Sequence, residues 1–196
     1  QLPKARVLAC PATATPIVRD EILARLGLPT DTPQLIHGFA RPNLALRVIE
    51  IQTKRERSRH VDDLLGENLG VAGHAGGTAI IYGPTRKSTE EEAQRLAVDG
   101  WISRAYHAGM EGVARDRVQN AFAAGEVEVV VATNAFGMGI DRADVRCIAH
   151  LAPPSSVEAY YQEAGRAGRD GEDAVCLLLI SPGDMALRRY LIESDT

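Results

Sequence analysis

The sequence predicts an α/β fold in which helices cover both faces of a parallel β-sheet. Strand-like and helix-like segments alternate along its 196 residues. Residues 127–132 are almost wholly apolar, as expected of a central strand that is buried on both faces. Hydrophobic residues make up 45% and charged residues 24% of the chain, an ordinary balance for a globular protein. The length suits one complete domain with part of a second.

The amino-terminal part is predicted to hold one helix and one strand. Thr15 and Pro16 are a favourable N-cap and first-turn pair, and Gly27 is a typical stop signal, so we expect a helix over residues 16–26. Large aliphatic side chains then occupy alternate positions over residues 44–48, which indicates a strand.

Residues 54–77 have the weakest pattern in the chain. They begin with a run of charged side chains and end in a glycine-rich loop signal. A helix is expected only around residues 61–65. We interpret the charged run as a solvated helix face, with contact to a DNA backbone as the alternative.

From residue 78 onward the alternation becomes regular. Strands are predicted over residues 79–82, 102–106, 127–132, 145–149 and 174–180. One helix is expected to begin at a capping box over residues 88–91 and to end near Gly100, and another to begin at a capping box of Ser155 and Glu158. Ser181 and Pro182 are expected to start the last helix. Another helix, over residues 111–123, has one apolar face: Val113, Ala114, Val118, Ala121 and Phe122.

Composition excludes several classes of protein. No apolar run approaches the ~20 residues that span a bilayer, and the start of the chain lacks the apolar core of a signal peptide. The three cysteines, Cys10, Cys147 and Cys176, lie far apart without metal-ligand spacing. Cys147 and Cys176 fall in strand-like runs and are expected to be buried thiols in a reducing compartment. The net charge of −4 argues neither for nor against nucleic acid.

Residues 83–88, Gly-Pro-Thr-Arg-Lys-Ser, have the look of a phosphate-binding loop but fail its requirements. That motif needs a glycine directly before the lysine and another five residues further back, where this chain has Arg86 and Ile81. The chain also lacks an acidic residue at the end of an apolar strand to hold Mg²⁺. A self-sufficient NTPase is therefore not expected.

Two other segments carry more specific chemistry. Residues 160–171 place Arg166 and Arg169 three apart, each after a glycine. Glycine permits close backbone approach, and arginine offers a planar, permanently charged fork for phosphate oxygens. Residues 129–141 run from a buried strand into a glycine-bearing loop that ends in Asp141, which is where parallel sheets bind ligands. Alone, the first could be a helix end with solvated arginines and the second a tight turn.

Together, about 30 residues apart, these segments closely resemble motifs VI and V of superfamily 2 helicases. The forms YYQEAGRAGRDG and ATNAFGMGID are similar to the RecQ branch of DNA helicases in particular. Four further segments match in order: residues 11–15 (motif III), 39–43 (the FxRPN entry to the second motor lobe), 80–86 (motif IV) and 106–110 (YHAG). The resemblance covers nearly the whole chain, least well over residues 54–77. It implies that residues 1–37 are the end of a first motor lobe with a linker, and that residues 38–196 are a second RecA-like lobe.

The resemblance also implies roles for individual residues. In this family ATP with Mg²⁺ binds between two lobes, and the first lobe brings the phosphate loop and the Mg²⁺-binding acid. Arg169 is then the arginine finger, which is typically worth about 10³–10⁵ in rate. Arg166 positions the same phosphates, Gln162 hydrogen-bonds across the cleft, and Gly139 and Asp141 lie near the ribose or the coupling network.

Four residues match family positions near the groove for single-stranded DNA: Arg86, Thr133, Asn134 and His107. His107 has the alternative of a packed histidine at a strand end, and Arg86 that of a surface residue opening a helix.

The chain departs from the family pattern in places. Gly83-Pro84-Thr85 replaces the usual Cys-Asn-Ser of motif IV, and the proline removes a backbone donor there. Pro11 stands where motif III usually has a hydroxyl residue. The family's four-cysteine zinc module and winged-helix module would follow Thr196, and the first residue is Gln rather than Met. We therefore expect a piece of a longer protein, or part of a degenerate one.

The resemblance implies a motor lobe for ATP-driven 3′-to-5′ DNA unwinding in repair and recombination, inactive by itself. Its expected partners are single-stranded and duplex DNA and the first motor lobe of the same parent chain, with no membrane. The expected location is the cytoplasm, at the nucleoid, in a bacterium, or the nucleus in a eukaryote. The alternatives are a DEAD-box RNA helicase lobe, disfavoured by Tyr161-Gln162-Glu163, and a non-catalytic scaffold, disfavoured by the intact Arg166 and Arg169.

Overall fold

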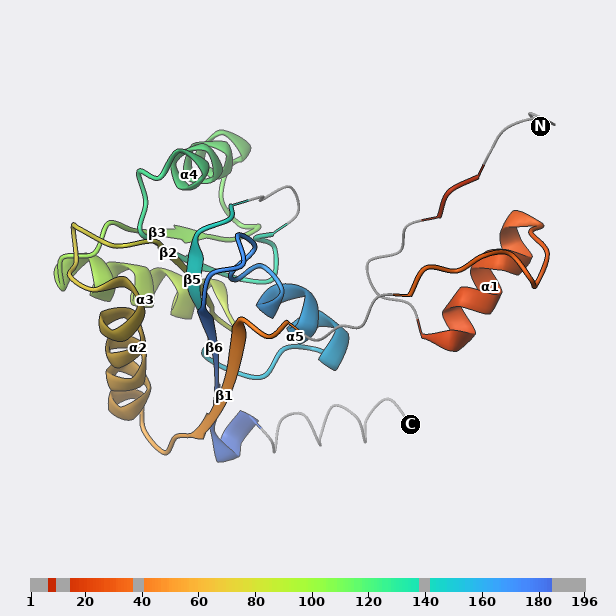
Figure 1. Cartoon of the computed structure of the whole chain (residues 1–196). Coiled ribbons are helices and arrows are strands. Elements are labelled where there is room, and N and C mark those ends of the chain that lie inside the picture. The colour runs from red at the N-terminus through yellow and green to blue at the C-terminus, as the bar shows by residue number, and fades with distance from the viewer. Residues whose placement is uncertain (1–6, 10–14, 37–40, 138–141, 185–196) are drawn as a thin grey trace. The chain divides into compact units, whose positions relative to one another are not determined.

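The computed structural model describes residues 7–9, 15–36, 41–137 and 142–184, and it divides the chain into two compact units, residues 1–40 and 41–196 (Figure 1). In the first unit, α1 (Pro16–Leu26) forms as predicted. The Thr15 hydroxyl accepts a hydrogen bond from the amide of Val18, and Gly27 ends the helix in a left-handed conformation (φ 64°).

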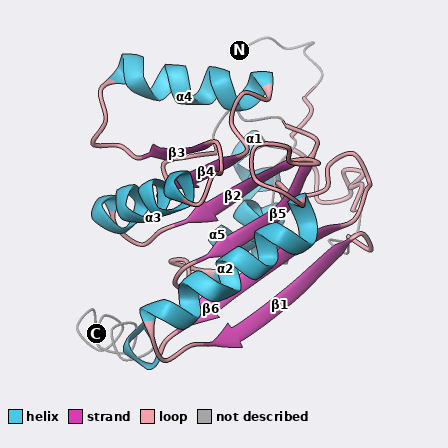
Figure 2. Ribbon diagram, turned by 90° about the vertical axis from the view of Figure 1, so that its left-hand side faces the viewer, coloured by secondary structure: helices cyan, strands magenta, loops and turns pink. Residues whose placement is uncertain are grey.

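The second unit is a six-stranded, wholly parallel sheet with the order β1-β6-β5-β2-β4-β3, seen in Figure 2. The predicted α/β fold is confirmed. The strands are β1 (Leu44–Glu50), β2 (Thr78–Tyr82), β3 (Ser103–Tyr106), β4 (Val129–Ala132), β5 (Val145–His150) and β6 (Ala174–Ile180). The helices are α2 (Lys54–Leu69), α3 (Arg86–Val98), α4 (Gly112–Ala124) and α5 (Val157–Ala164).

Helices cover the two faces of the sheet in pairs. Helices α2 and α3 pack on one face, where Ile81 of β2 belongs to their apolar cluster. Helices α4 and α5 pack on the other face, where the neighbouring Ile80 belongs to a second cluster. Both isoleucines are fully buried, so alternate residues of a central strand serve opposite cores. The predicted burial of Cys147 and Cys176 is confirmed, while Cys10 lies outside the described residues.

Several predicted helix starts are wrong because local caps act earlier or later than the pattern indicated. Helix α2 begins at Lys54, far before residue 61, since the Thr53 hydroxyl caps it by accepting from the amide of Glu56. Its charged first turns are largely exposed, which agrees with a solvated helix face. Helix α3 begins at Arg86 because the capping box joins Thr85 and Ser88.

Smaller corrections apply to the remaining helices. Helix α5 is capped by Ser156, one residue after the predicted Ser155. In α4, Val118 and Phe122 face the core as predicted, whereas Val113 is 63% exposed. Helical backbone begins at Pro182 as expected, and Ser181 and Asp184 cap it reciprocally. Among the described helices, none combines the length and apolarity needed to cross a membrane.

Candidate functional site

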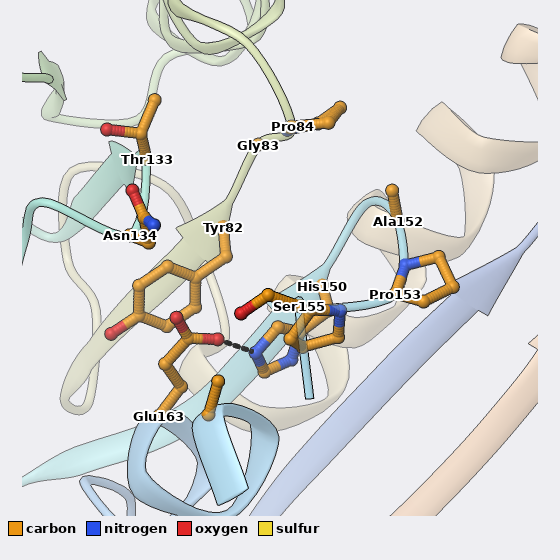
Figure 3. Close-up of a pocket in the computed structure, with 12 residues that line it drawn as sticks. Tyr82, Gly83, Pro84, Thr133, Asn134, His150, Ala152, Pro153, Ser155 and Glu163 are labelled. Carbon is orange, nitrogen blue, oxygen red and sulfur yellow. Dashed lines mark hydrogen bonds and ion pairs between the residues drawn. The ribbon is translucent and has the colours of Figure 1, made fainter. Parts of the chain in front are cut away.

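A cavity of about 250 Å³ opens where β2, β4 and β5 end, at the carboxyl edge of the sheet (Figure 3). Parallel sheets bind ligands at this edge. The lining residues are Tyr82, Gly83, Pro84, Thr133, Asn134, His150, Ala152, Pro153, Pro154, Ser155, Ala159 and Glu163.

A buried histidine ties the wall of this cavity together. His150 is 1% exposed, and its Nε2 lies 2.8 Å from a carboxylate oxygen of Glu163, which reaches across from α5 (Figure 3). The His150 ring stacks on Tyr82 at 5.0 Å and lies 5.0 Å from the ring of Tyr160. Burial raises the pKa of the Tyr82 hydroxyl. Sequence reasoning missed this group; its only signal was a histidine ending an apolar strand with a glutamate in the next helix.

The turn after β2 is tightly packed, and its side chains hydrogen-bond within the turn. A Cβ at Gly83 would lie 2.7 Å from the Thr89 hydroxyl oxygen, so only glycine fits there. The Thr85 hydroxyl accepts from the amide of Ser88 at 3.1 Å, and the Ser88 hydroxyl accepts from the amide of Thr85. The amides of Thr85 and Ser88 are thus satisfied within the chain at the start of α3.

The four residues predicted to contact nucleic acid, Arg86, His107, Thr133 and Asn134, all follow the carboxyl ends of β2, β3 or β4; we call them the carboxyl-edge group. His107 is 5% exposed, and its Nε2 lies 2.8 Å from a carboxylate oxygen of Glu90. The Arg86 guanidinium lies over Gly109, where a Cβ would be 2.8 Å from Nη1. Thr133 and Asn134 line the cavity. Arg86 and Asn134 are exposed, whereas His107 is packed, as its alternative interpretation had it.

Residues 165–171, which we call the arginine loop, follow the carboxyl end of α5 and lead toward the start of β6. Arg166 Nη1 donates a hydrogen bond to the carbonyl of Gly137, in the predicted ligand loop after β4. Gly137 has a φ of +146°, and a Cβ there would overlap the Arg166 guanidinium. Gln162 and Arg169 are exposed. Thus the structure joins Arg166 to the loop after β4, while the predicted Gly139 and Asp141 lie outside the described residues.

The arginine loop is also fixed to the start of β5. The amide of Gly168 donates to the carbonyl of Val145 at 2.9 Å. Arg146 forms an ion pair with Asp170, and its hydrogen bond lowers the pKa of that carboxyl. The arginine loop is therefore held at two places: Arg166 contacts the loop after β4, and Gly168 and Asp170 lie beside the amino end of β5. The carboxyl-edge group follows the carboxyl ends of β2, β3 and β4.

Two further predicted features have no described geometry. Residues 11–14 of the motif III segment and residues 39–40 of the FxRPN segment lie outside the described parts. Within the residues that the structure describes, no group of three or more His, Cys, Asp and Glu side chains is placed to hold a metal ion.

Comparison with known proteins points to one family. Residues 57–171 match the family described as the helicase conserved C-terminal domain. The chain is 39% identical over 189 residues to the ATP-dependent DNA helicase RecQ of Bacillus subtilis, a match covering 96% of this chain and 30% of that protein. It is 41% identical over 195 residues to the bifunctional 3′-5′ exonuclease/ATP-dependent helicase WRN of Mus musculus, covering 97% and 13%. The chain thus spans 30% or less of the length of these two relatives.

Solved structures of low identity share the fold. A DEAD box protein from the hyperthermophile Methanococcus jannaschii superposes with a TM-score of 0.62 at 23% identity, covering 79% of this chain and 40% of that one. The C-terminal domain of the DEAD-box protein Dbp5 superposes with a TM-score of 0.60 at 20% identity, covering 78% and 84%. These likenesses establish the RecA-like α/β fold and nothing about substrate.

Proposed function

The chain belongs to the family of the helicase conserved C-terminal domain, in its RecQ branch, and we propose that it is the second motor lobe of an ATP-dependent DNA helicase. The proposed reaction is ATP hydrolysis coupled to 3′-to-5′ unwinding of DNA in repair and recombination. The parent protein would act in the cytoplasm at the nucleoid of a bacterium, or in the nucleus of a eukaryote.

The arginine loop is the observation that carries this proposal. Its backbone is fixed at Gly168 by a 2.9 Å hydrogen bond, and Arg166 is docked on the carbonyl of Gly137. Arg169 stands exposed in the same loop. A permanently charged guanidinium on a fixed backbone suits stabilisation of the charge that develops on a transferred γ-phosphoryl group.

The loop also fits the polyphosphate of ATP. Arg166 is partly exposed beside Gly137, and its permanently charged, planar guanidinium suits phosphate oxygens. Arg169 would supply the finger, Arg166 would hold the phosphates, and Gln162 would hydrogen-bond across the cleft. The first motor lobe of the parent chain would hold Mg²⁺ and the phosphate loop, so the isolated chain would not hydrolyse ATP.

The carboxyl-edge group would form part of the groove for single-stranded DNA. Arg86 and Asn134 are exposed, and the cavity beside Thr133 and Asn134 offers polar groups at one edge of the sheet. Cationic and amide side chains of this kind contact phosphates without reading sequence. His107, packed against Glu90, would position this surface rather than contact DNA.

The test is ATP hydrolysis by the purified chain and by its parent protein. The chain alone should show no turnover. Turnover by the isolated chain that depends on Arg169 would overturn the assignment of the phosphate loop and Mg²⁺ to the first motor lobe. In the parent, Arg169→Ala should lower DNA-stimulated kcat by about 10³–10⁵ while ATP binding persists. The matched control is Arg47→Ala, which removes an exposed arginine of β1 that pairs with Glu67 of α2, and it should leave kcat unchanged.

Two alternatives are separated by the same assay. An RNA helicase lobe of the DEAD-box type would give stimulation by RNA in place of DNA. A non-catalytic scaffold would give no stimulated hydrolysis by the parent and no effect of Arg169→Ala.

A further inference from the structure

We propose that Arg41 and Asn43 are positioning residues that hold the arginine loop by its backbone carbonyls, so that Arg169 reaches the nucleotide. The proposal rests on the proposed function, because it assigns the loop's geometry to catalysis. Arg41 is the first residue of the second compact unit, so the chain enters this unit at the arginine loop.

Arg41 spans the loop with both ends of its guanidinium fork. Its Nη2 donates to the carbonyls of Ala167 at 3.0 Å and of Gly168 at 2.5 Å. Its Nη1 lies 3.5 Å from the carbonyl of Gly165. A planar, permanently charged fork can hold several carbonyls in one geometry, which a lysine ammonium on a flexible stem cannot.

Asn43 adds two hydrogen bonds beside those of Arg41. Its Nδ2 donates to the carbonyl of Gly168 at 2.9 Å and to that of Glu172 at 2.8 Å. The Asn43 carbonyl in turn accepts from the amide of Ala174 at 2.9 Å, directly before Leu44 and Ala174 pair as β1 and β6. The backbone of Asn43 is therefore fixed by the sheet, and its side chain fixes Gly168 of the loop relative to the sheet.

Gly168 is the residue that permits this close approach. Its φ is +57°, and a Cβ there would lie 2.6 Å from Asn43 Nδ2 and 2.7 Å from the carbonyl of Glu172. Both observations require glycine at position 168, because other residues rarely adopt this φ and the site has no room for a Cβ. The second glycine of the GRAGR sequence thus serves the contact with Asn43.

The captured carbonyls bracket both arginines. Gly165 and Ala167 flank Arg166, and Gly168 directly precedes Arg169. Each of these bonds from Arg41 and Asn43 ends on a backbone carbonyl and none on the side chain of Arg166 or Arg169. A displacement of about 1 Å in a catalytic group can lower a rate about 100-fold, so a loop freed from Arg41 should lose turnover before it loses ATP affinity.

The test is a double-mutant cycle on single-turnover ATP hydrolysis by the DNA-bound parent protein. Arg41→Ala should lower the rate about 10- to 100-fold and change KM for ATP by less than about threefold. In an Arg169→Ala background the same change should lower the residual rate by less than about twofold, because no finger is left to position. Arg41→Lys should recover only part of the rate, and Arg47→Ala, on β1 and paired with Glu67, should match wild type in both backgrounds.

Each other outcome decides against a defined part of the argument. Equal losses from Arg41→Ala in both backgrounds, or no loss in either, overturn the positioning role. Normal hydrolysis by Arg169→Ala overturns the proposed function itself. If the melting temperature shows that Arg41→Ala does not fold, Asn43→Ala takes its place in the same cycle. It removes the two bonds to Gly168 and Glu172, and the same two outcomes apply to it.

Discussion

The arginine loop and the carboxyl-edge group carry the candidate chemistry of this lobe, and they are held in place in different ways. The loop depends on donors from far along the chain: Arg41 bonds to Gly168 across 127 positions, and Gly137 and Val145 add contacts from two more segments. The carboxyl-edge group depends on strand ends and helix caps, as with Thr133, whose amide donates to Tyr106. The loop should therefore respond to changes at Arg41 and Asn43, and the edge group to changes within β2, β3, β4 and the turns that follow them.

The largest effect on activity is expected from a pair of glycine substitutions inside the arginine loop. Both Gly168 and Gly171 have positive φ, +57° and +89°, but only at Gly168 would a Cβ meet other atoms. Gly168→Ala should lower DNA-stimulated kcat of the parent about 100-fold, since it displaces the loop from Asn43. Gly171→Ala adds only backbone strain of about 1–2 kcal/mol and should lower kcat much less. Equal losses for the two variants would show that tertiary contacts do not set the loop's function.

The next largest effect is expected at Glu163 of α5, which lines the cavity, pairs with His150 and lies just before the arginine loop. Glu163→Ala leaves the buried His150 Nε2 without its partner and should lower the free energy of unfolding of the chain by about 1–3 kcal/mol. Urea denaturation measures this. Glu91→Ala, which removes an exposed partner of Lys87, is the control and should stay within about 0.5 kcal/mol of wild type. Similar small losses of unfolding free energy in both variants would show that the His150–Glu163 pair stabilises the fold no more than an exposed ion pair does.

A smaller effect, on affinity rather than stability, is expected in the carboxyl-edge group. Arg86→Ala in the parent should weaken single-stranded DNA binding, and the slope of log affinity against log salt should fall by about 1, because one phosphate contact is lost. Fluorescence anisotropy at several salt concentrations measures both. Lys87→Ala removes the next cation, which is also exposed and pairs with Glu91, and should change neither. An unchanged slope for Arg86→Ala would show that Arg86 does not contact a DNA phosphate.

The sequence predicted the strands far better than the contacts that fix the arginine loop. β6 forms over the predicted residues 174–180, because an apolar run between turn signals has little alternative to a buried strand. Helix starts were harder, since Thr85 and Ser88 are both plausible caps, and in the structure Thr85 is the N-cap while Ser88 completes its capping box. The pairing of Arg41 with Gly168 had no local signal, because hydrogen bonds to backbone carbonyls leave no trace in the residues that accept them.

The residues of the candidate site divide in the same way. Motif spacing selected Arg166, Thr133 and Asn134, and the structure places them at the loop after β4 or in the cavity. The roles of these three residues, and those of Arg169 and Gln162, stay predictions. His150 and Glu163 were not predicted, since a histidine and a glutamate 13 positions apart meet only when β5 and α5 pack together.

The smallest effect is expected at Asp170, the exposed member of the arginine loop's ion pair. The hydrogen bond from Arg146 lowers the folded-state pKa of Asp170 below its ordinary value of 3.8. The carboxylate therefore stabilises the fold above that value, and this contribution disappears as the pH falls through the lowered pKa. Asp170→Asn should lower the urea midpoint slightly at neutral pH, and the gap to wild type should close in acid.

The hydrolysis rate of the same variant then separates exposed charge from carbonyl capture as the cause of the loop's position. Exposed pairs contribute little and are screened by salt, so Asp170→Asn should leave kcat of the parent within about twofold of wild type, and high salt should remove the difference in urea midpoint. A gap in midpoint that persists or widens in acid would contradict the lowered pKa. A large loss of kcat would mean that Arg146 and Asp170 fix the loop together with Arg41 and Asn43.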